Sequence, residues 1–136
     1  MAMGFIAILV AAIAAMVLGF IWYSPQVFGN EWMKLMKIGK KQIAQAKKKG
    51  MSKTYLTMLI SSLLTSYILA SFIALLGITE AIDGALLAVM LWLGFIATTT
   101  LSSILWEGKP AKLYILNNGY HLVSLVVMGI ILALWS

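Results

Sequence analysis

Four apolar stretches, each long enough to cross a bilayer as a helix, constrain the fold of this chain more than any other feature. They cover residues 3–23, 55–77, 84–106 and 113–135, and none carries a charged residue in its interior. A helix needs about 20 apolar residues to span the hydrocarbon core. Hydrophobic residues make up 62% of the chain and charged residues 10%, which is far from the balance of a soluble domain. The sequence therefore predicts an all-α integral membrane four-helix bundle, formed as the single domain 1–136.

The lysines are divided unevenly among the connections between these stretches. Eight of the ten lie between the first and second stretches, and Lys109 and Lys112 lie between the third and fourth. The remaining connection, 78–83, has no lysine and carries two acidic residues. Loops rich in lysine stay on the cytoplasmic side of a membrane. We therefore predict a multi-pass protein of a prokaryotic cell (cytoplasmic) membrane, with the N- and C-termini outside.

The segment 30–50 carries most of the lysines and has an amphipathic pattern. Trp32, Leu35 and Met36 fall near one face of a helix, and Gly39 divides the segment into two short pieces. This pattern is typical of a segment that lies in the membrane interface. The predicted partners are therefore the lipid bilayer and its anionic lipid headgroups, and nucleic acid is not expected. A solvated charged hairpin is the alternative interpretation.

Small residues recur every four positions along the first stretch. Such spacing forms a shallow ridge on one face of a helix, where a neighbouring backbone can approach closely. Two roles are open for this ridge, because it can pack within the bundle or form a subunit interface. We expect a homo-oligomer, since four helices bury little of each other. The ridge consists of Ala7, Ala11, Ala15 and Gly19.

Uncharged polar residues gather in the cytoplasmic halves of the last three stretches, whereas the outer halves are almost wholly apolar. Polar side chains in lipid pair with one another, bind water or donate to carbonyls of their own helix. One interpretation is a polar pocket that opens to the cytoplasm. The other is that serine and threonine bond within their own helices and asparagine joins the helices together. The predicted pocket comprises Ser62, Thr65, Ser66, Thr99, Ser102, Asn117, Asn118, Tyr120 and His121.

The residues that most catalytic and metal sites require are absent or poorly placed. The chain has no cysteine, and His121 is its only histidine. Metal binding would need several ligands, and only the distant Glu31 and Glu107 are available. Hydrolysis would need an acid placed to orient the histidine. We therefore expect no enzyme activity, no metal and no cofactor.

Aromatic and turn-forming residues mark a corner at the cytoplasmic end of the first stretch. Trp22 and Tyr23 suit the membrane boundary, and Pro25 prevents the helix from continuing. A second corner lies on the same membrane face, where Glu107 and Lys109 can pair across a turn. The predicted cytoplasmic corner comprises Trp22, Tyr23, Pro25, Gly29, Trp32, Trp106, Glu107 and Lys109.

Several short motifs resemble one family of membrane proteins. The first stretch ends in "WYSP", and "FG" and a tryptophan before "MKLM" follow; "LGF" at 93–95, "WEGKP" at 106–110 and "NNGYH" at 117–121 come later. Together they resemble the domain-of-unknown-function 1761 family of small four-span prokaryotic membrane proteins. The resemblance implies a four-helix membrane fold and carries no activity. The matching characteristic residues are Trp22, Tyr23, Pro25, Gly29, Trp32, Glu107, Asn117, Gly119 and Tyr120.

Two functions from different classes are compatible with these patterns. The first is handling of a small solute or lipid through a cytoplasm-facing polar pocket. The second is a non-transporting structural or assembly role, in which the small-residue ridges dock other subunits. A hydrated cavity that reaches His121 would favour the first function, and a dry bundle with all polar side chains paired would exclude it.

Overall fold

All the regular secondary structure in the described residues is helical. The computed structural model describes residues 4–37, 39–50 and 52–135. Four spans are long and apolar enough to cross a membrane: Phe5–Trp22, Ser52–Leu76, Ala81–Leu105 and Ala111–Trp135. The predicted fold class, an all-α membrane bundle, is confirmed. Its elements are α1 (Phe5–Trp22), α2 (Gly29–Met36), α3 (Lys40–Lys49), α4 (Ser52–Leu76), α5 (Ala81–Leu91), the π-helix η1 (Trp92–Ala97), α6 (Ser102–Leu105) and α7 (Ala111–Trp135).

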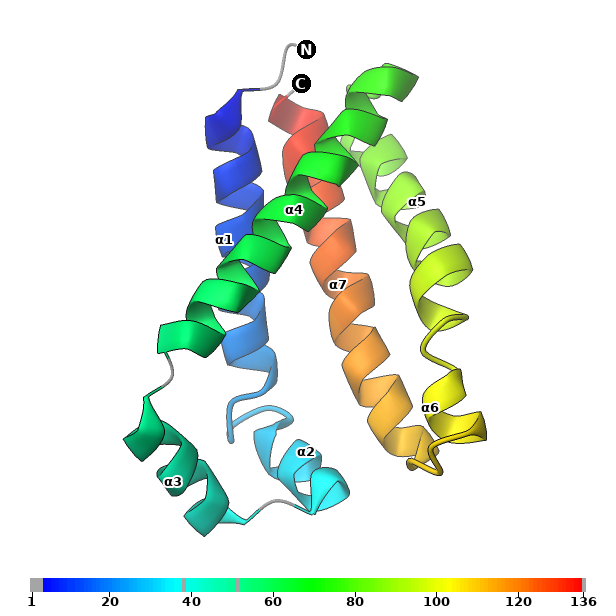
Figure 1. Ribbon diagram of the computed structural model, residues 1–136. Coiled ribbons are helices and arrows are strands. Elements are labelled where there is room, and N and C mark those ends of the chain that lie inside the picture. The colour runs from blue at the N-terminus through cyan, green and yellow to red at the C-terminus, as the bar shows by residue number, and fades with distance from the viewer. Residues whose placement is uncertain (1–3, 38, 51, 136) are drawn as a thin grey trace.

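The last helix, α7, lies at the centre of the bundle, where it packs against α1, α4 and α5. The start of α1 and the end of α7 lie at one end of the bundle, and α2, α3 and the turn between α6 and α7 lie at the other (Figure 1). We call this second end the lysine end, because both lysine-bearing connections are there. Helix α4 crosses the bundle obliquely and diverges from α5 and η1 toward the lysine end (Figure 1).

The small-residue ridge of α1 faces the interior of the bundle. All four of its members, Ala7, Ala11, Ala15 and Gly19, are buried. The ridge is covered by α4 and α7, the two helices with which α1 makes its main contacts. Of the two roles open to it, the structure assigns packing within the chain. A homo-oligomer, which stays a prediction, would therefore need another surface.

A close helix crossing joins α5 to α7 through glycines. A Cβ atom on Gly84 would overlap the carbonyl oxygen of Gly129 and lie 2.8 Å from the Cβ of Ala133. A Cβ on Gly129 would likewise lie 2.5 Å from the carbonyl oxygen of Gly84. Small residues allow this approach of two backbones, which is the usual way that membrane helices gain packing contacts.

The third span is not one regular α-helix. After α5 the chain widens into η1, passes through a turn at 98–101 and resumes as the short helix α6. The hydroxyls of Thr98 and Thr100 each donate to the carbonyl four residues earlier, at 2.7 Å. Threonine hydroxyls that bond to their own helix in this way compete with backbone hydrogen bonds and bend helices. The run of three threonines lies at the point where regular helix is lost.

The amphipathic segment between α1 and α4 consists of two short helices, α2 and α3. Helix α2 ends at Lys37, whose backbone is left-handed with φ of 58°. Trp32, Leu35 and Met36 of α2 are partly buried, and α2 packs on α7. The change of direction near residue 37 matches the predicted division near Gly39. The placement of this segment in a membrane interface stays a prediction.

Candidate functional site

Three cavities adjoin one another along α7, and each has a different chemical character. The lysine-end cavity has a volume of about 330 Å³ and lies between α2, α7 and the residues that precede α7. The central cavity, of about 370 Å³, lies between α1, α4, η1 and α7. The third, which we call the apolar groove, has about 300 Å³ and lies between α4 and the α5–η1 segment. These volumes are at the lower end of the range for small-ligand pockets.

His121 joins the two polar cavities, because its side chain lines both of them. Residues three and four positions apart share one face of a helix. Asn117, His121, Leu125 and Met128 therefore form one stripe along α7, and this stripe passes from the lysine-end cavity into the central cavity. The sequence predicted one polar pocket, and the structure divides it into two cavities that meet at the histidine.

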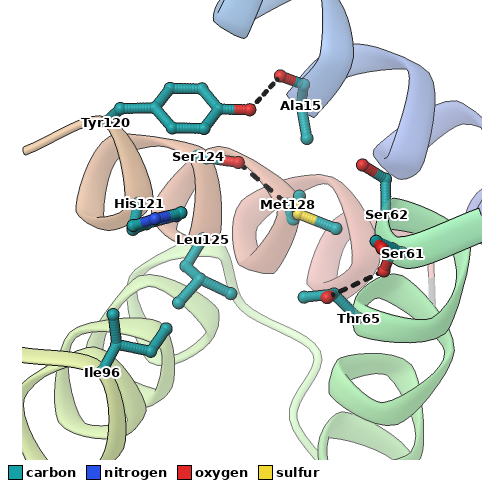
Figure 2. A pocket seen from close by; sticks show the side chains of 10 residues that line it. All are labelled: Ala15, Ser61, Ser62, Thr65, Ile96, Tyr120, His121, Ser124, Leu125 and Met128. Carbon is teal, nitrogen blue, oxygen red and sulfur yellow. Dashed lines mark hydrogen bonds between the residues drawn. The ribbon is translucent and has the colours of Figure 1, made fainter. Parts of the chain in front are cut away.

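Polar side chains enter the central cavity from two sides. Figure 2 shows Ser61, Ser62 and Thr65 on α4 across from His121 on α7. The Thr65 hydroxyl donates to the Ser61 carbonyl at 3.0 Å. Tyr120 and Ser124, also on α7, are engaged as well: the phenol donates to the Ala15 carbonyl at 2.9 Å, and the hydroxyl contacts the Met128 sulfur at 3.9 Å.

Three polar groups of the central cavity lack such partners. The hydroxyls of Ser61 and Ser62 and the imidazole of His121 make no hydrogen bond to any residue that the structure describes. Among the described residues, the one aromatic ring that the imidazole contacts is that of Tyr120, and the two ring centroids are 5.4 Å apart. These three groups are therefore available to water or to a ligand.

The lysine-end cavity is lined by hydrogen-bond donors and by no carboxylate. Asn117 accepts a hydrogen bond through Oδ1, which leaves its amide NH₂ group available. Lys109 and Ser103 line the same cavity, and neither side chain is paired within the described part of the chain. Asn118 differs, because Thr100 donates to its Oδ1 at 3.0 Å and its amide donates to the Tyr114 carbonyl at 3.0 Å. It is a structural asparagine.

The corner after α1 is bonded directly to α7. The Trp22 indole donates to the Leu116 carbonyl at 3.1 Å, and the Tyr23 phenol donates to Asn117 Oδ1 at 2.7 Å. Gly119 lies against the Trp22 ring, which a Cβ at this position would approach to 3.2 Å. The "WY" of the first motif and the "NNGY" of the last one are thus two halves of a single contact.

Gly29 closes this corner. It is buried, and its amide donates to the Ser24 carbonyl at 2.7 Å. A Cβ on Gly29 would lie 2.6 Å from the carbonyl carbon of Ser24 and would overlap the Tyr23 carbonyl oxygen. Aromatic rings then fix the start of α2, because Tyr23 packs edge-on against Trp32 at 5.9 Å. Pro25 is exposed at the tip of the turn.

Some of the predicted pocket residues lie elsewhere. Ser66 is fully buried and donates to the Ile8 carbonyl at 2.8 Å, so it joins α4 to α1. Thr99 and Ser102 are exposed, donate to the carbonyls of Phe95 and Thr99 respectively, and line none of the three cavities. Ser66 therefore joins two helices, and Thr99 and Ser102 bond to carbonyls of their own span, as the alternative to the pocket predicted. Ser62, Thr65, Asn117, Asn118, Tyr120 and His121 line the two polar cavities.

The second half of the predicted corner joins the first only in part. Trp106 is 86% exposed, and Glu107 is exposed as well. Lys109 lines the lysine-end cavity, as does Trp32. Glu107 and Lys109 do not pair; the ion pair in the described part of the chain joins Glu31 to Lys112 at 3.4 Å. It connects α2 to α7, and the predicted pairing across the turn is not found.

Sequence reasoning left several residues that line these cavities out of the predicted pocket, three serines among them. Ser61 and Ser124 line the central cavity, and Ser103 lines the lysine-end cavity. The signal for Ser124 was its spacing of three residues from His121 on one helix face. In the described ranges, no group of three or more histidine, cysteine, aspartate or glutamate residues gathers as potential metal ligands.

Comparison with known proteins identifies one family. The profile of DUF1761, described as a protein of unknown function, matches residues 6–133. The match covers the four spans apart from Phe5 at the start of α1 and the last two residues of α7. A search of curated proteins and a search of solved structures gave no match.

Proposed function

The chain belongs to the DUF1761 family of proteins of unknown function, and we propose that it binds a small solute or a lipid inside the membrane. The site is the central cavity at His121, and its entrance is the lysine-end cavity. The ligand is held by hydrogen bonds in a region that lipid otherwise surrounds.

One observation carries this proposal: three polar groups without partners face one cavity at membrane depth. His121 is ten residues beyond Ala111 at the start of α7, which places it about 15 Å along the helix axis. Ser61 and Ser62 lie at a similar distance along α4. Ser61 and His121 are exposed and Ser62 is half-buried, so it is lipid or a ligand, and not the packed protein, that surrounds their polar atoms. In lipid an unpaired polar group costs about 1–3 kcal/mol or more. A chain that gathers three of them in one cavity gains most when water or a ligand supplies the missing hydrogen bonds.

The entrance follows from the position of His121 between the two polar cavities. A ligand that enters beside Lys109 reaches the imidazole without passing between tightly packed helices, because the lysine-end cavity ends at the same side chain. The positive-inside rule assigns this end to the cytoplasm. The proposed cavity is therefore cytoplasm-facing, and the plasma membrane is the proposed location.

The structural or assembly role receives less support. That role requires small-residue ridges that are free to dock other subunits. The ridge of α1 is instead buried against α4 and α7 of the same chain. Gly84 of α5 and Gly129 of α7 likewise pack against each other within the chain. No reaction is proposed at the site, because neither polar cavity has a carboxylate in its lining.

The proposal can be tested by identifying what purified protein carries. The full chain is purified in a mild detergent, and small molecules extracted from it are identified by mass spectrometry. We expect wild-type protein to carry a specific species. His121→Phe and the double variant Ser61→Ala/Ser62→Ala should lose about tenfold or more of it, since each removes hydrogen bonds that only the ligand satisfies.

Ser71→Ala is the matched control. The Ser71 hydroxyl lies on the same helix as Ser61 but donates to the Tyr67 carbonyl at 2.9 Å, outside the cavity. This variant should retain the species at the wild-type level. Equal amounts in wild type and His121→Phe would overturn the proposal, as would a wild-type protein that retains no specific species.

A further inference from the structure

We infer that the ligand of the central cavity is a single-chain amphiphile with an anionic head: the head lies in the lysine-end cavity and the acyl chain lies in the apolar groove. This inference rests on the proposed function and names the class of its ligand. The observation behind it is that the three cavities follow one another in the order cationic, hydroxyl-lined and apolar.

The apolar groove is continuous with the central cavity. Thr65, Ile96 and Leu125 line both spaces. Beyond them the groove is walled by Leu64, Ile68 and Phe72 of α4, and by Leu91 and Phe95 on the opposite side. A ligand that occupies the central cavity therefore has a hydrophobic passage directly beside it.

The groove faces the lipid through a gap between two diverging helices. Helix α4 separates from η1 toward the lysine end (Figure 1), and the floor between them is α7. Leu64 and Phe95 are 62% and 71% exposed on the two rims. An acyl chain can enter such a gap sideways from the bilayer, because no polar group has to lose its water on the way. A small polar solute would gain nothing from this passage.

The lysine-end cavity selects the charge of the head. Its available groups are the ammonium of Lys109, the hydroxyl of Ser103 and the amide NH₂ of Asn117, together with the imidazole of His121. All of these can donate hydrogen bonds, and no carboxylate lines the cavity. Phosphate and carboxylate groups accept several such hydrogen bonds at once, and bonds to an ionised acceptor are about twice as strong as neutral ones.

The middle of the ligand is polar as well. Ser61, Ser62 and His121 line the central cavity, between the head and the chain, where a glycerol hydroxyl or an ester carbonyl would satisfy them. The groove has about 300 Å³, close to the lower limit for small-ligand pockets, and therefore accommodates one chain in preference to two. These features together describe a single-chain amphiphile with a phosphate or carboxylate head, and lysophosphatidic acid is a probe of this class.

The experiment uses full-length protein reconstituted in neutral phosphatidylcholine vesicles. The probe is lysophosphatidic acid with a photoreactive diazirine near the end of its chain. After illumination, mass spectrometry should locate the cross-links on α4 near Ile68 and Phe72 and on η1 near Phe95. Cross-links spread evenly over the exposed apolar surface of the bundle would contradict the inference.

Filling the groove should prevent the binding of the chain. Ile68→Trp and Phe95→Trp enlarge a side chain on each wall, and each should lower cross-linking about tenfold, because overfilling a packed site costs about 1–3 kcal/mol. Leu75→Trp is the matched control, since Leu75 is on the same helix, 83% exposed and outside the groove. Unchanged cross-linking in both groove variants would overturn the inference.

Competition then tests the head. Unlabelled lysophosphatidic acid should displace the probe, and Lys109→Gln should weaken that displacement about tenfold. Lysophosphatidylcholine, whose phosphate bears a cationic choline, should displace it less well. Displacement by inorganic phosphate alone would show that the site is an anion site without a chain, and equal displacement by the two lysophospholipids would show that charge is not selected. Either result would contradict the inference.

These outcomes are separate from those of the proposed function. If Ile68→Trp leaves binding unchanged while His121→Phe still removes the species that purified protein carries, then a ligand occupies the central cavity and only its assignment as an amphiphile is wrong. If His121→Phe changes nothing in either experiment, then the proposed function itself is wrong.

Discussion

The phenol of Tyr23 donates a hydrogen bond of 2.7 Å to Oδ1 of Asn117 and so joins the corner after α1 to α7 across 94 residues of sequence. This contact holds the side chain of Asn117, which lines the lysine-end cavity. The corner is therefore part of the cavity wall as well as the end of a helix.

Removal of this hydrogen bond should destabilise the fold. Tyr23→Phe deletes the donor and leaves the Asn117 oxygen without a partner, which should lower the free energy of unfolding by about 1–2 kcal/mol. Reversible denaturation in mixed micelles measures the effect. Tyr67→Phe is the control, because Tyr67 is 51% exposed on α4, and this variant should be close to wild type. Equal stabilities of the two variants would contradict the assigned role of Tyr23.

The crossing of α5 and α7 should not accept a side chain larger than hydrogen at either glycine. Gly84→Ala places a methyl group into the carbonyl of Gly129, so the helices must move apart, and the free energy of unfolding should fall by about 1–3 kcal/mol. Gly94→Ala is the matched variant on the same span, since a Cβ there meets nothing within 4 Å. Thermal unfolding followed by circular dichroism distinguishes them, and a Gly84→Ala protein as stable as Gly94→Ala would refute this packing.

The turn before α2 depends in the same way on Gly29. Gly29→Ala should destabilise the corner by about 1–3 kcal/mol, because its methyl group would meet backbone atoms of residues 23 and 24, which cannot rotate away. Gly39→Ala adds a methyl group where nothing lies within 4 Å and should be nearly neutral. Thermal unfolding followed by circular dichroism measures the difference between the two variants. A neutral Gly29→Ala variant would mean that the corner is looser than described.

Helix α3 should gather anionic lipid at the lysine end. Each lysine near a charged membrane surface contributes about 1 kcal/mol of attraction. Replacing the exposed Lys41, Lys48 and Lys49 with glutamine should therefore deplete phosphatidylglycerol from the lipid shell of the protein. Lipid extracted with the protein in polymer nanodiscs and quantified by mass spectrometry measures this change. A shell of unchanged composition would favour the solvated hairpin.

Much of the fold follows from the sequence because the transfer of a helix into lipid depends on the residues of that helix alone. Apolar length by itself predicts the four spans. The small-residue spacing of α1 predicts a close-packing face, although it does not tell whether the face covers its own chain or another. The pairing of Gly84 with Gly129 was not predicted, because it depends on which helices are neighbours and on the register in which they cross.

The site was only partly predictable, and threonine and serine explain why. A hydroxyl in a helix has two outcomes, a bond to its own backbone or a role in a cavity, and the residue type does not distinguish them. Thr99 and Ser102 have the first outcome, whereas Ser62 has the second. His121 could be assigned to the polar pocket from sequence, because it lies in the polar half of the stretch 113–135. Its position between two cavities required the structure.

The central claim is that the cavity at His121 is open to water from the lysine end, and cysteine accessibility tests it most directly. The chain has no cysteine, so single substitutions can be labelled without background. Ser62→Cys in sealed vesicles of known orientation is treated with a membrane-impermeant methanethiosulfonate reagent on one side at a time. Ile60→Cys is the lipid-facing control, because Ile60 is two residues away on α4, exposed and outside the three cavities. We predict that Ser62→Cys reacts with reagent on the lysine side only, and that Ile60→Cys reacts from neither side. If Ser62→Cys is as unreactive as Ile60→Cys from both sides, the cavity is dry and closed, and the proposed function is wrong.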